Sequence, residues 1–516
     1  MATTTTGDRG VSAVTPAQSP AVVKPFNAGS PNPPAGGNES SEQRTGQAGS
    51  SAAMNFPHIL SKDLGSDDAG NNATHTVAYN FGTRPEEASQ QHASLSDLIS
   101  LDDLASYSSV YFSTLGTIGD FIDARIYAQR CKKHYVDNGS TTDSTSFVFG
   151  AIAASMAALG SFLSSIKHPH EADLVQYAKA ILDDPAYLRK PDVQFIIAYS
   201  LRVFYLRATT RPSNAWIASC TGLHLCEAVG LHEEESIKKI AAAAGAAQLG
   251  LDEDRLRRIF WVPWAGNAIL SYEYDRSSVY LRTITTQEIM PIAGSVADQF
   301  VHMAQIIPGP NSPFELTAKP RTQTEDLFER LKALHAIELA DPFLLITRAD
   351  IAFCFYRRAY QLKMGIPDEF AQIVIDIGST AVDAGVQLSK VAFFWNIIGS
   401  IFHFTCILLA IDTPQAATHI SSAFKGLEAL VTAADTKHTR EALSMTRKLL
   451  DLHLGRKRKE LAQLEPIQAS YQPSQSPPDL PDPGNMINMP EFGYGIDWDQ
   501  FILEPYLPMF NTDVQL

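Results

Sequence analysis

The strongest constraint on the fold is a long central region, residues 108–465, in which apolar residues recur with the spacing of amphipathic α-helices. Few stretches in this region alternate apolar and polar residues as half-buried β-strands do. The sequence therefore predicts an all-α domain, interrupted by a loop near residues 283–322. Helices are expected near residues 117–135, 143–166, 171–183, 191–208, 213–229, 252–272, 324–340, 344–363, 368–388, 391–411, 415–435 and 437–463.

Two tails of different composition flank this region. Residues 1–105 are rich in Ser, Thr, Gly, Pro and Ala, and such a segment buries too little apolar surface to offset the entropy of ordering. We expect a disordered tail there, although residues 94–107 mix Leu and Ile with Asp in a pattern compatible with a short amphipathic helix. Residues 466–516 read as a Pro/Ser linker followed by an acidic and aromatic tail.

Charge and cysteine content narrow the class of protein. The net charge of −15 favours protein partners or small molecules over an extended phosphate-binding surface. The five cysteines are scattered and odd in number, which is typical of a reducing compartment without a disulfide framework. The first ten residues lack the apolar core of a signal peptide, so secretion is not expected.

Residues 391–411 form an uncharged apolar stretch that is long enough to cross a bilayer. The alternative is a buried helix in a large helical domain. The flanks lack a clear basic bias and the neighbouring segments are amphipathic. These features favour the buried helix and argue against a membrane anchor.

No common catalytic motif is present: the sequence has no GxSxG, GxxxxGK[ST] or HExxH, and no GxGxxG after a predicted strand. His168, His170 and Glu171 could be read as metal ligands, but they lie in a loop without further ligands, and a solvated turn is the favoured explanation. Cys220 and His224 share a helix face, yet a zinc site needs about four converging ligands. We expect no enzyme activity, no cofactor and no catalytic or metal-binding residues.

The segment 211–291 carries the most specific pattern. An Arg and a Trp open it, an Ala-x-Gly-Leu-His run ends the first helix, and Glu-x-x-x-Arg-Arg-Ile-Phe-Trp begins the second. This combination resembles the fungal-specific transcription factor domain, the middle homology region of fungal zinc binuclear cluster regulators. The matching residues are Arg211, Trp216, Gly230, Leu231, His232, Arg257, Arg258 and Trp261.

The resemblance covers about residues 108–415 and implies an all-helical regulatory domain in a nuclear transcription regulator. Such regulators often control metabolic or secondary-metabolite gene clusters. Phe260 stands where the family often has a first Trp, and Asn267-Ala268 stands where it often has Asp-Arg, which indicates a divergent member.

The family's usual DNA-reading module is a six-cysteine zinc cluster near the start of the chain. The first cysteine in this sequence is Cys131, within the helical region. We therefore expect DNA contacts only indirectly, through another factor, or through an N-terminal module that this sequence lacks by gene loss or by an omitted exon.

The C-terminal tail supports a regulator on independent grounds. No Lys or Arg follows Lys459, and acidic residues alternate with aromatic and aliphatic ones near the end of the chain. Trp498, Phe501 and Ile502 would share one face of a helix, which suits a coactivator groove. A solubilising tail or a segment packed on the domain are the alternatives.

A basic cluster precedes this tail near the end of the last predicted helix. It is a candidate nuclear import signal, and a solvated cap on the helix dipole is the alternative. The cluster consists of Arg456, Lys457, Arg458 and Lys459.

The leading hypothesis is a nuclear transcription regulator that works through the helical domain and the acidic tail. Its alternative is a co-regulator or effector-sensing scaffold that does not bind DNA and is tethered to another transcription factor. A small-molecule effector and a homodimer are compatible with both. An enzyme on a helical scaffold and a membrane protein anchored by residues 391–411 are the weaker hypotheses.

Overall fold

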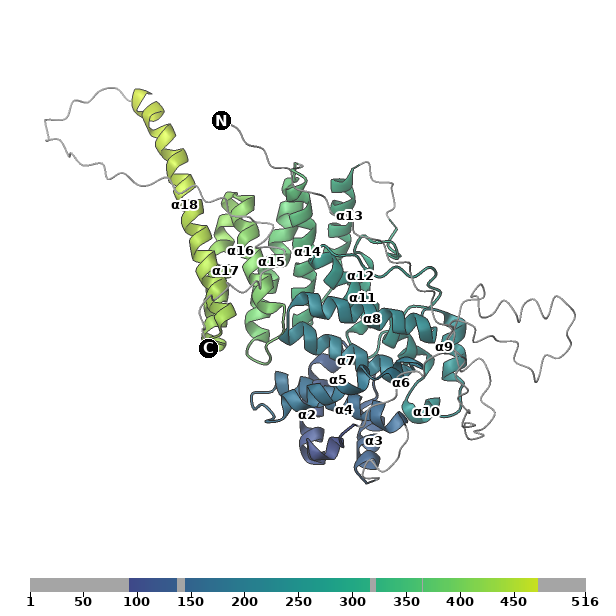
Figure 1. Cartoon of the computed structure of the whole chain (residues 1–516). Coiled ribbons are helices and arrows are strands. Elements are labelled where there is room, and N and C mark those ends of the chain that lie inside the picture. The colour runs from purple at the N-terminus through teal and green to yellow at the C-terminus, as the bar shows by residue number, and fades with distance from the viewer. Residues whose placement is uncertain (1–91, 137–143, 316–321, 364, 472–516) are drawn as a thin grey trace, which may run out of the picture. The chain divides into compact units, whose positions relative to one another are not determined.

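The computed structural model describes residues 92–136, 144–315, 322–363 and 365–471 (Figure 1). Within these ranges every regular element is helical, which confirms the predicted all-α class. The 3₁₀ helices are η2 (Leu95–Asp97) and η3 (Leu115–Thr117). The α-helices are α2 (Leu101–Ser113), α3 (Ala124–Val136), α4 (Ser144–Leu163), α5 (Glu171–Leu182), α6 (Pro185–Leu188), α7 (Val193–Thr209), α8 (Pro212–Val229), α9 (Glu234–Ala241), α10 (Ala246–Leu249), α11 (Glu253–Glu273), α12 (Ala297–Gln305), α13 (Gln323–His335), α14 (Pro342–Gln361), α15 (Asp368–Leu388), α16 (Ile397–Ile411), α17 (Pro414–Ala433) and α18 (Lys437–Tyr471).

Short polar side chains begin many of these helices. The side chains of Asp192, Asp252 and Asp341 each accept a hydrogen bond from a backbone N–H in the first turn of α7, α11 and α14. At the end of α8, Gly230 takes a left-handed conformation with φ of 86°, which a residue without a Cβ adopts at little cost. Local sequence therefore sets the ends of the helices that carry the family motif.

The N-terminal half of the fold is built around α4, whose small residues allow close packing. Helices α2, α5 and α7 all pack against it. At Gly160 an added Cβ would lie 1.9 Å from the carbonyl oxygen of Tyr107, so α2 touches the α4 backbone directly. One apolar stretch of α4, Ser146–Leu163, is long enough to cross a membrane, but 83% of it is buried inside the fold. These residues form the core of this half.

The C-terminal half consists of α13 to α18. Helices α14, α15, α16 and α17 pack in sequence order, and α18 lies along α16 and α17 (Figure 1). At Gly378 an added Cβ would lie 2.2 Å from the ring of Phe404, so α15 and α16 are in close contact. The C-terminal part of α18, residues 456–468, is exposed.

Helix α11 connects the two halves, and α8 packs on it. Helix α8 packs on α7 and on α11, while α11 also contacts α12 and α14. The helix pair that matches the family motif therefore lies where the halves meet.

Several predicted boundaries were wrong. The ordered region begins before residue 105, within the stretch 94–107 whose pattern is compatible with a short amphipathic helix, and Leu95, Ile99 and Leu104 are buried in the core. The predicted loop 283–322 contains α12, whose residues Phe300 and Met303 face the core. The helix predicted from residue 117 begins only at Ala124. Two further errors concern α16 and α18.

The helix predicted for 391–411 starts only at Ile397, because Phe394 and Trp395 leave the helical path and pack against Phe343. Helix α18 extends to residue 471, past the predicted start of the linker at 466. The predicted activation residues Trp498, Phe501 and Ile502 lie outside the described residues.

Candidate functional site

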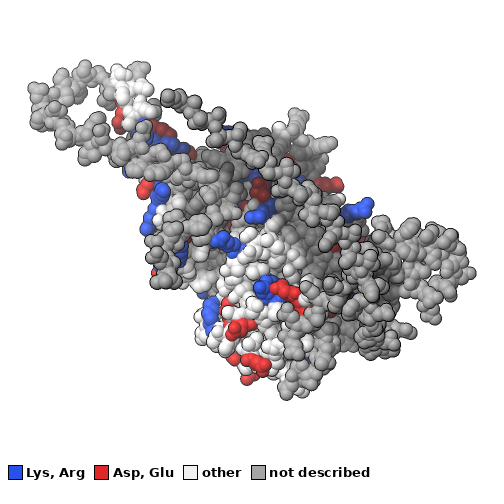
Figure 2. Space-filling model, viewed as in Figure 1, with Lys and Arg blue, Asp and Glu red and all other residues white. Residues whose placement is uncertain are grey.

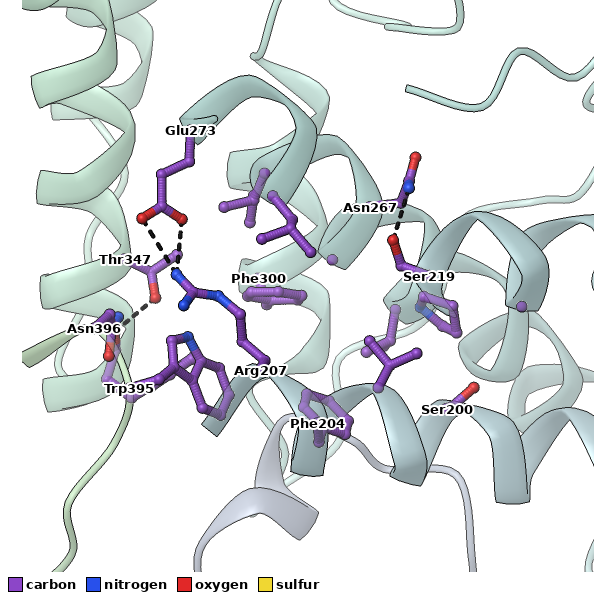
Figure 3. Close-up of a pocket in the computed structure, with 18 of the residues that line it drawn as sticks. Ser200, Phe204, Arg207, Ser219, Asn267, Glu273, Phe300, Thr347, Trp395 and Asn396 are labelled. Carbon is purple, nitrogen blue, oxygen red and sulfur yellow. Dashed lines mark hydrogen bonds and ion pairs between the residues drawn. The ribbon is translucent and has the colours of Figure 1, made fainter. Parts of the chain in front are cut away.

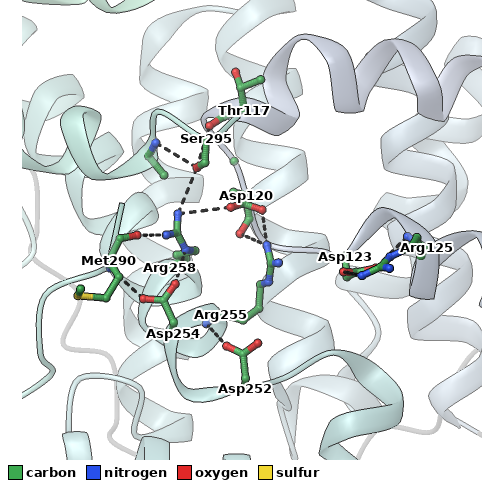
Figure 4. A network of polar contacts seen from close by, with 12 residues as sticks. Thr117, Asp120, Asp123, Arg125, Asp252, Asp254, Arg255, Arg258, Met290 and Ser295 are labelled. Atoms are coloured by element: carbon green, nitrogen blue, oxygen red, sulfur yellow. Dashed lines mark hydrogen bonds and ion pairs between the residues drawn. The ribbon is translucent and has the colours of Figure 1, made fainter. Parts of the chain in front are cut away.

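The first half of α11 carries Arg255 and the two motif arginines, Arg257 and Arg258, and each is held by acidic partners. Arg255 and Arg258 both form ion pairs with Asp120, which lies in the segment before α3 (Figure 4). The Arg258 side chain is fully buried, and its Nε donates to Asp254 at 2.7 Å. A buried guanidinium with this many partners indicates a structural anchor.

The same arginines attach the loop that follows α11. Arg258 donates to the carbonyl oxygen of Met290 and, at 3.1 Å, to the Ser295 hydroxyl (Figure 4). Arg257 pairs with Glu234 of α9, and this arginine holds the pKa of the Glu234 carboxyl below its usual value. Trp261 donates from its indole to the Gln287 carbonyl oxygen at 2.8 Å.

The end of α8 attaches to this loop from the other side. The backbone N–H of Leu231 bonds back to Cys226 across Gly230, and Leu231 itself is fully buried. Its carbonyl oxygen accepts from the Thr286 hydroxyl at 2.7 Å, and that of His232 accepts from the Thr285 N–H at 3.0 Å. These motif residues thus meet at residues 283–296.

The two residues that open the motif lie at the other end of α8. Arg211 is exposed at the helix start. Trp216 donates to Ser271 and Ser277, and the Arg276 guanidinium lies 5.0 Å from its ring centre. Trp216 therefore belongs to the framework around α11, and neither Arg211 nor Trp216 lines the pocket described next.

The second half of α11 lines a partly enclosed pocket of about 80 Å³ (Figure 3). Its walls come from five helices, α7, α8, α11, α12 and α14, and from the segments before α3 and α16. The residues that form these walls include Phe121, Val203, Phe204, Val262, Ile269, Leu270, Phe300, Phe343 and Trp395. Gly266 adds open space, because a Cβ built there would meet no atom within 4 Å. The pocket is large enough for several water molecules or part of a small ligand.

One end of the pocket carries charged and amide groups. Arg207 of α7 donates to both carboxylate oxygens of Glu273 on α11, at 2.9 and 3.2 Å. Asn396 donates to the Asp350 carboxyl of α14 at 3.2 Å, while its own side-chain oxygen is buried without a hydrogen-bond partner. Burial, and secondarily the nearby Glu273 carboxylate, raises the pKa of Asp350 well above its usual value.

The opposite end of the pocket is also polar, and its polar groups form hydrogen bonds with one another. Asn267 donates to the Ser219 hydroxyl at 2.9 Å and accepts from the Val279 N–H at 3.1 Å. Beside it Pro263 lies inside α11 and cannot bond to the Ile259 carbonyl oxygen, which the thiol of Cys226 approaches at 4.0 Å. The pocket therefore has one saturated polar end and one end with spare hydrogen-bonding capacity.

Sequence reasoning identified the framework residues and missed the pocket. The pocket residues come from segments far apart in the chain, so no local pattern connects them. Two signals could have drawn attention to α11: Asn267, a departure from the family pattern, and the helical Gly266. Among the residues that the structure describes, no three His, Cys, Asp or Glu side chains are grouped to hold a metal ion.

The basic cluster lies on the exposed part of α18. Arg456 and Lys457 pair with Asp412, each at 2.7 Å, while Arg458 and Lys459 are exposed on the same helix. On the face shown in Figure 2, Lys and Arg side chains lie close to Asp and Glu.

Comparison with known proteins connects the chain to fungal regulators. It is 36% identical to Protein RDR1 of Saccharomyces cerevisiae over 427 residues, which is 82% of this chain and 75% of that protein. It is 28% identical to transcription factor kojR of Aspergillus flavus over 411 residues, which is 79% of this chain and 71% of kojR. Protein RDR1 of Gibberella zeae is 25% identical over 408 residues, 77% of this chain and 71% of that protein. No protein-family model matches the chain.

Proposed function

The chain belongs to the family of fungal transcription regulators that includes Protein RDR1 and transcription factor kojR, and we propose that it is a nuclear, ligand-responsive member. Its helical domain holds a small effector in the pocket at the second half of α11. The proposed targets are metabolic genes, with a secondary-metabolite cluster as the specific expectation.

The position of the pocket supports this proposal. Its walls include α7 and α8 on the N-terminal side and α14 and Trp395 on the C-terminal side. A ligand in such a pocket contacts both halves of the domain, and it stabilises the arrangement in which both sets of contacts form. The domain can thus convert ligand binding into a change in how the halves pack, which the tails transmit to partners.

Filling the pocket tests the proposal. Gly266→Leu places a side chain in open space, and we expect a strain with this variant to lose the transcriptional response to inducing growth conditions. Gly455→Leu is the control, because Gly455 is also helical and open but lies outside the pocket. RNA sequencing in which Gly266→Leu matches the parent while both proteins are equally abundant would refute the proposed role.

The acidic tail provides the proposed transcriptional output. Residues 480–516 fused to an unrelated DNA-binding domain are expected to activate a reporter through a coactivator, with Trp498, Phe501 and Ile502 as the apolar anchors. Replacing these three residues together with Ala should abolish activation. Neutralising Asp497, Asp499 and Glu504 should reduce it only partly, and equal activity of the triple Ala variant would identify the tail as a solubilising segment.

The basic cluster is the proposed nuclear import signal. Because Arg456 and Lys457 also pair with Asp412, the informative variant changes only Arg458 and Lys459 to Ala. We expect a fluorescent fusion of this variant to accumulate in the cytoplasm. Unchanged nuclear signal would assign the cluster to the solvation of α18.

A further inference from the structure

The charges at the polar end of the pocket balance only while Asp350 keeps its proton. Arg207 and Glu273 neutralise each other through their ion pair. Asp350 has no ion-pair partner among the residues that the structure describes. Its polar neighbours are the neutral Asn396 amide at 3.2 Å and the Ser400 hydroxyl, and the charged Arg207 and Glu273 lie further off. An ionised Asp350 would leave one negative charge in a place that is shielded from water.

This end also presents a buried acceptor that no described residue satisfies. Asn396 is 94% buried, and its side-chain oxygen has no hydrogen-bond donor among the described residues. The Asp350 carboxyl supplies further acceptor sites. A buried acceptor left without a donor costs about 1–3 kcal/mol. A ligand that brings several hydrogen-bond donors to this point should therefore bind more tightly than a ligand that brings acceptors.

The aromatic wall adds a second preference. The ring of Trp395 packs against Phe343 with ring centres 5.5 Å apart and against Phe204 with ring centres 6.1 Å apart. In Figure 3 the side chains of Trp395, Arg207 and Asn396 lie close together at this end of the pocket. Aromatic faces attract cations, and the attraction is stronger where water is excluded.

Building on the proposed ligand-responsive function, we propose that the effector is a small organic amine that binds as its ammonium cation. The ammonium group lies between the Asp350 carboxylate and the Asn396 oxygen, beside Trp395. The apolar body of the ligand lies along Val262, Gly266 and Leu270. An ammonium supplies the missing positive charge and up to three donors in one compact group.

Three probes of similar size test the chemical class on the full chain. By isothermal titration, 2-phenylethylamine is expected to bind at least tenfold more tightly than 2-phenylethanol, and phenylacetate to bind most weakly. Asp350→Asn should weaken the amine at least tenfold and leave the alcohol unchanged. Asp383→Asn makes the same chemical change at an exposed position on α15 and should change neither.

The outcomes separate this inference from the proposed function. If the alcohol binds as tightly as the amine and Gly266→Leu abolishes its binding, the pocket remains a ligand site and the amine class is wrong. If phenylacetate binds most tightly, the ligand is an acid. If none of the three binds, or if Asp350→Asn leaves the amine affinity unchanged, the inference fails regardless of the transcriptional result for Gly266→Leu.

Discussion

The polar groups around the two halves of α11 differ in whether they have partners within the protein. Those around the first half are paired and hold the fold together, whereas some of those that face the second half remain available to a ligand. In the first half, Arg257 is matched by the carboxylates of Glu234 and Glu253, and Arg258 is matched by carboxylates and by the Met290 carbonyl oxygen. Beside the second half, Glu273 of α11 is paired, but Asp350 of α14 has no ion pair among the described residues and the Asn396 oxygen lacks a donor. The saturated groups around the first half indicate a structural role, and the unsatisfied buried groups that face the second half indicate where a ligand would bind.

The largest expected effect comes from breaking the saturated half. Arg258→Met removes a fully buried guanidinium and leaves Asp254 and Asp120 with fewer partners. Removing one member of a buried ion pair costs about 3–5 kcal/mol. Urea unfolding should show a loss of this size, while Arg458→Ala on the exposed face of α18 should show almost none. A small effect of Arg258→Met would remove the distinction between the two halves.

The second prediction compares two helical glycines. An added Cβ at Gly378 meets the Phe404 ring, so Gly378→Ala should destabilise by about 1–3 kcal/mol. Gly266 faces open space, and Gly266→Ala should instead stabilise by roughly 0.5–1 kcal/mol through helix propensity. Thermal unfolding of both variants measures the difference. Loss of stability in Gly266→Ala would mean that the pocket is already filled.

These glycines illustrate what could be predicted from the sequence. The end of α8 at Gly230 and the start of α11 after Asp252 follow from local capping chemistry, and both were predicted. The late start of α16 follows from the packing of Phe394 and Trp395 on Phe343, a residue about 50 positions away.

The pocket could not be predicted for the same reason as the late start of α16. Arg207, Asp350 and Asn396 come together only through the packing of the two halves. The motif was visible because its residues are neighbours in the chain. The pocket was not visible because its residues are neighbours only in space.

The third prediction concerns the end of α8. Gly230 has a φ of 86°, which a side chain disfavours, so Gly230→Ala should cost about 1 kcal/mol. The loss should appear in the unfolding midpoint and leave amine binding unchanged, because Gly230 belongs to the framework. A change in ligand affinity of this variant would show that the framework and the pocket are coupled.

The fourth prediction concerns Asp350 and depends on pH. Its pKa is raised in the folded state by burial and by Glu273, so the folded protein keeps this proton where the unfolded chain has lost it. The corresponding stability is present at low pH and is lost as the pH rises through the folded pKa. The Asp350→Asn variant does not undergo this loss. Its free energy of unfolding, measured by urea titration relative to that of the parent, should therefore increase from pH 5 to pH 8. An advantage that shrinks with pH would indicate an ionised Asp350 with an unrecognised cation.

The most direct test of the contrast within α11 is hydrogen exchange of the full chain with and without 2-phenylethylamine. We expect slower exchange in α7, in residues 262–273 of α11, in α14 and around residues 395–400. The arginine-bearing turn at residues 253–258 should change little. Protection confined to residues 253–258, or no protection at saturating amine, would contradict the division of α11 into a structural half and a ligand-binding half.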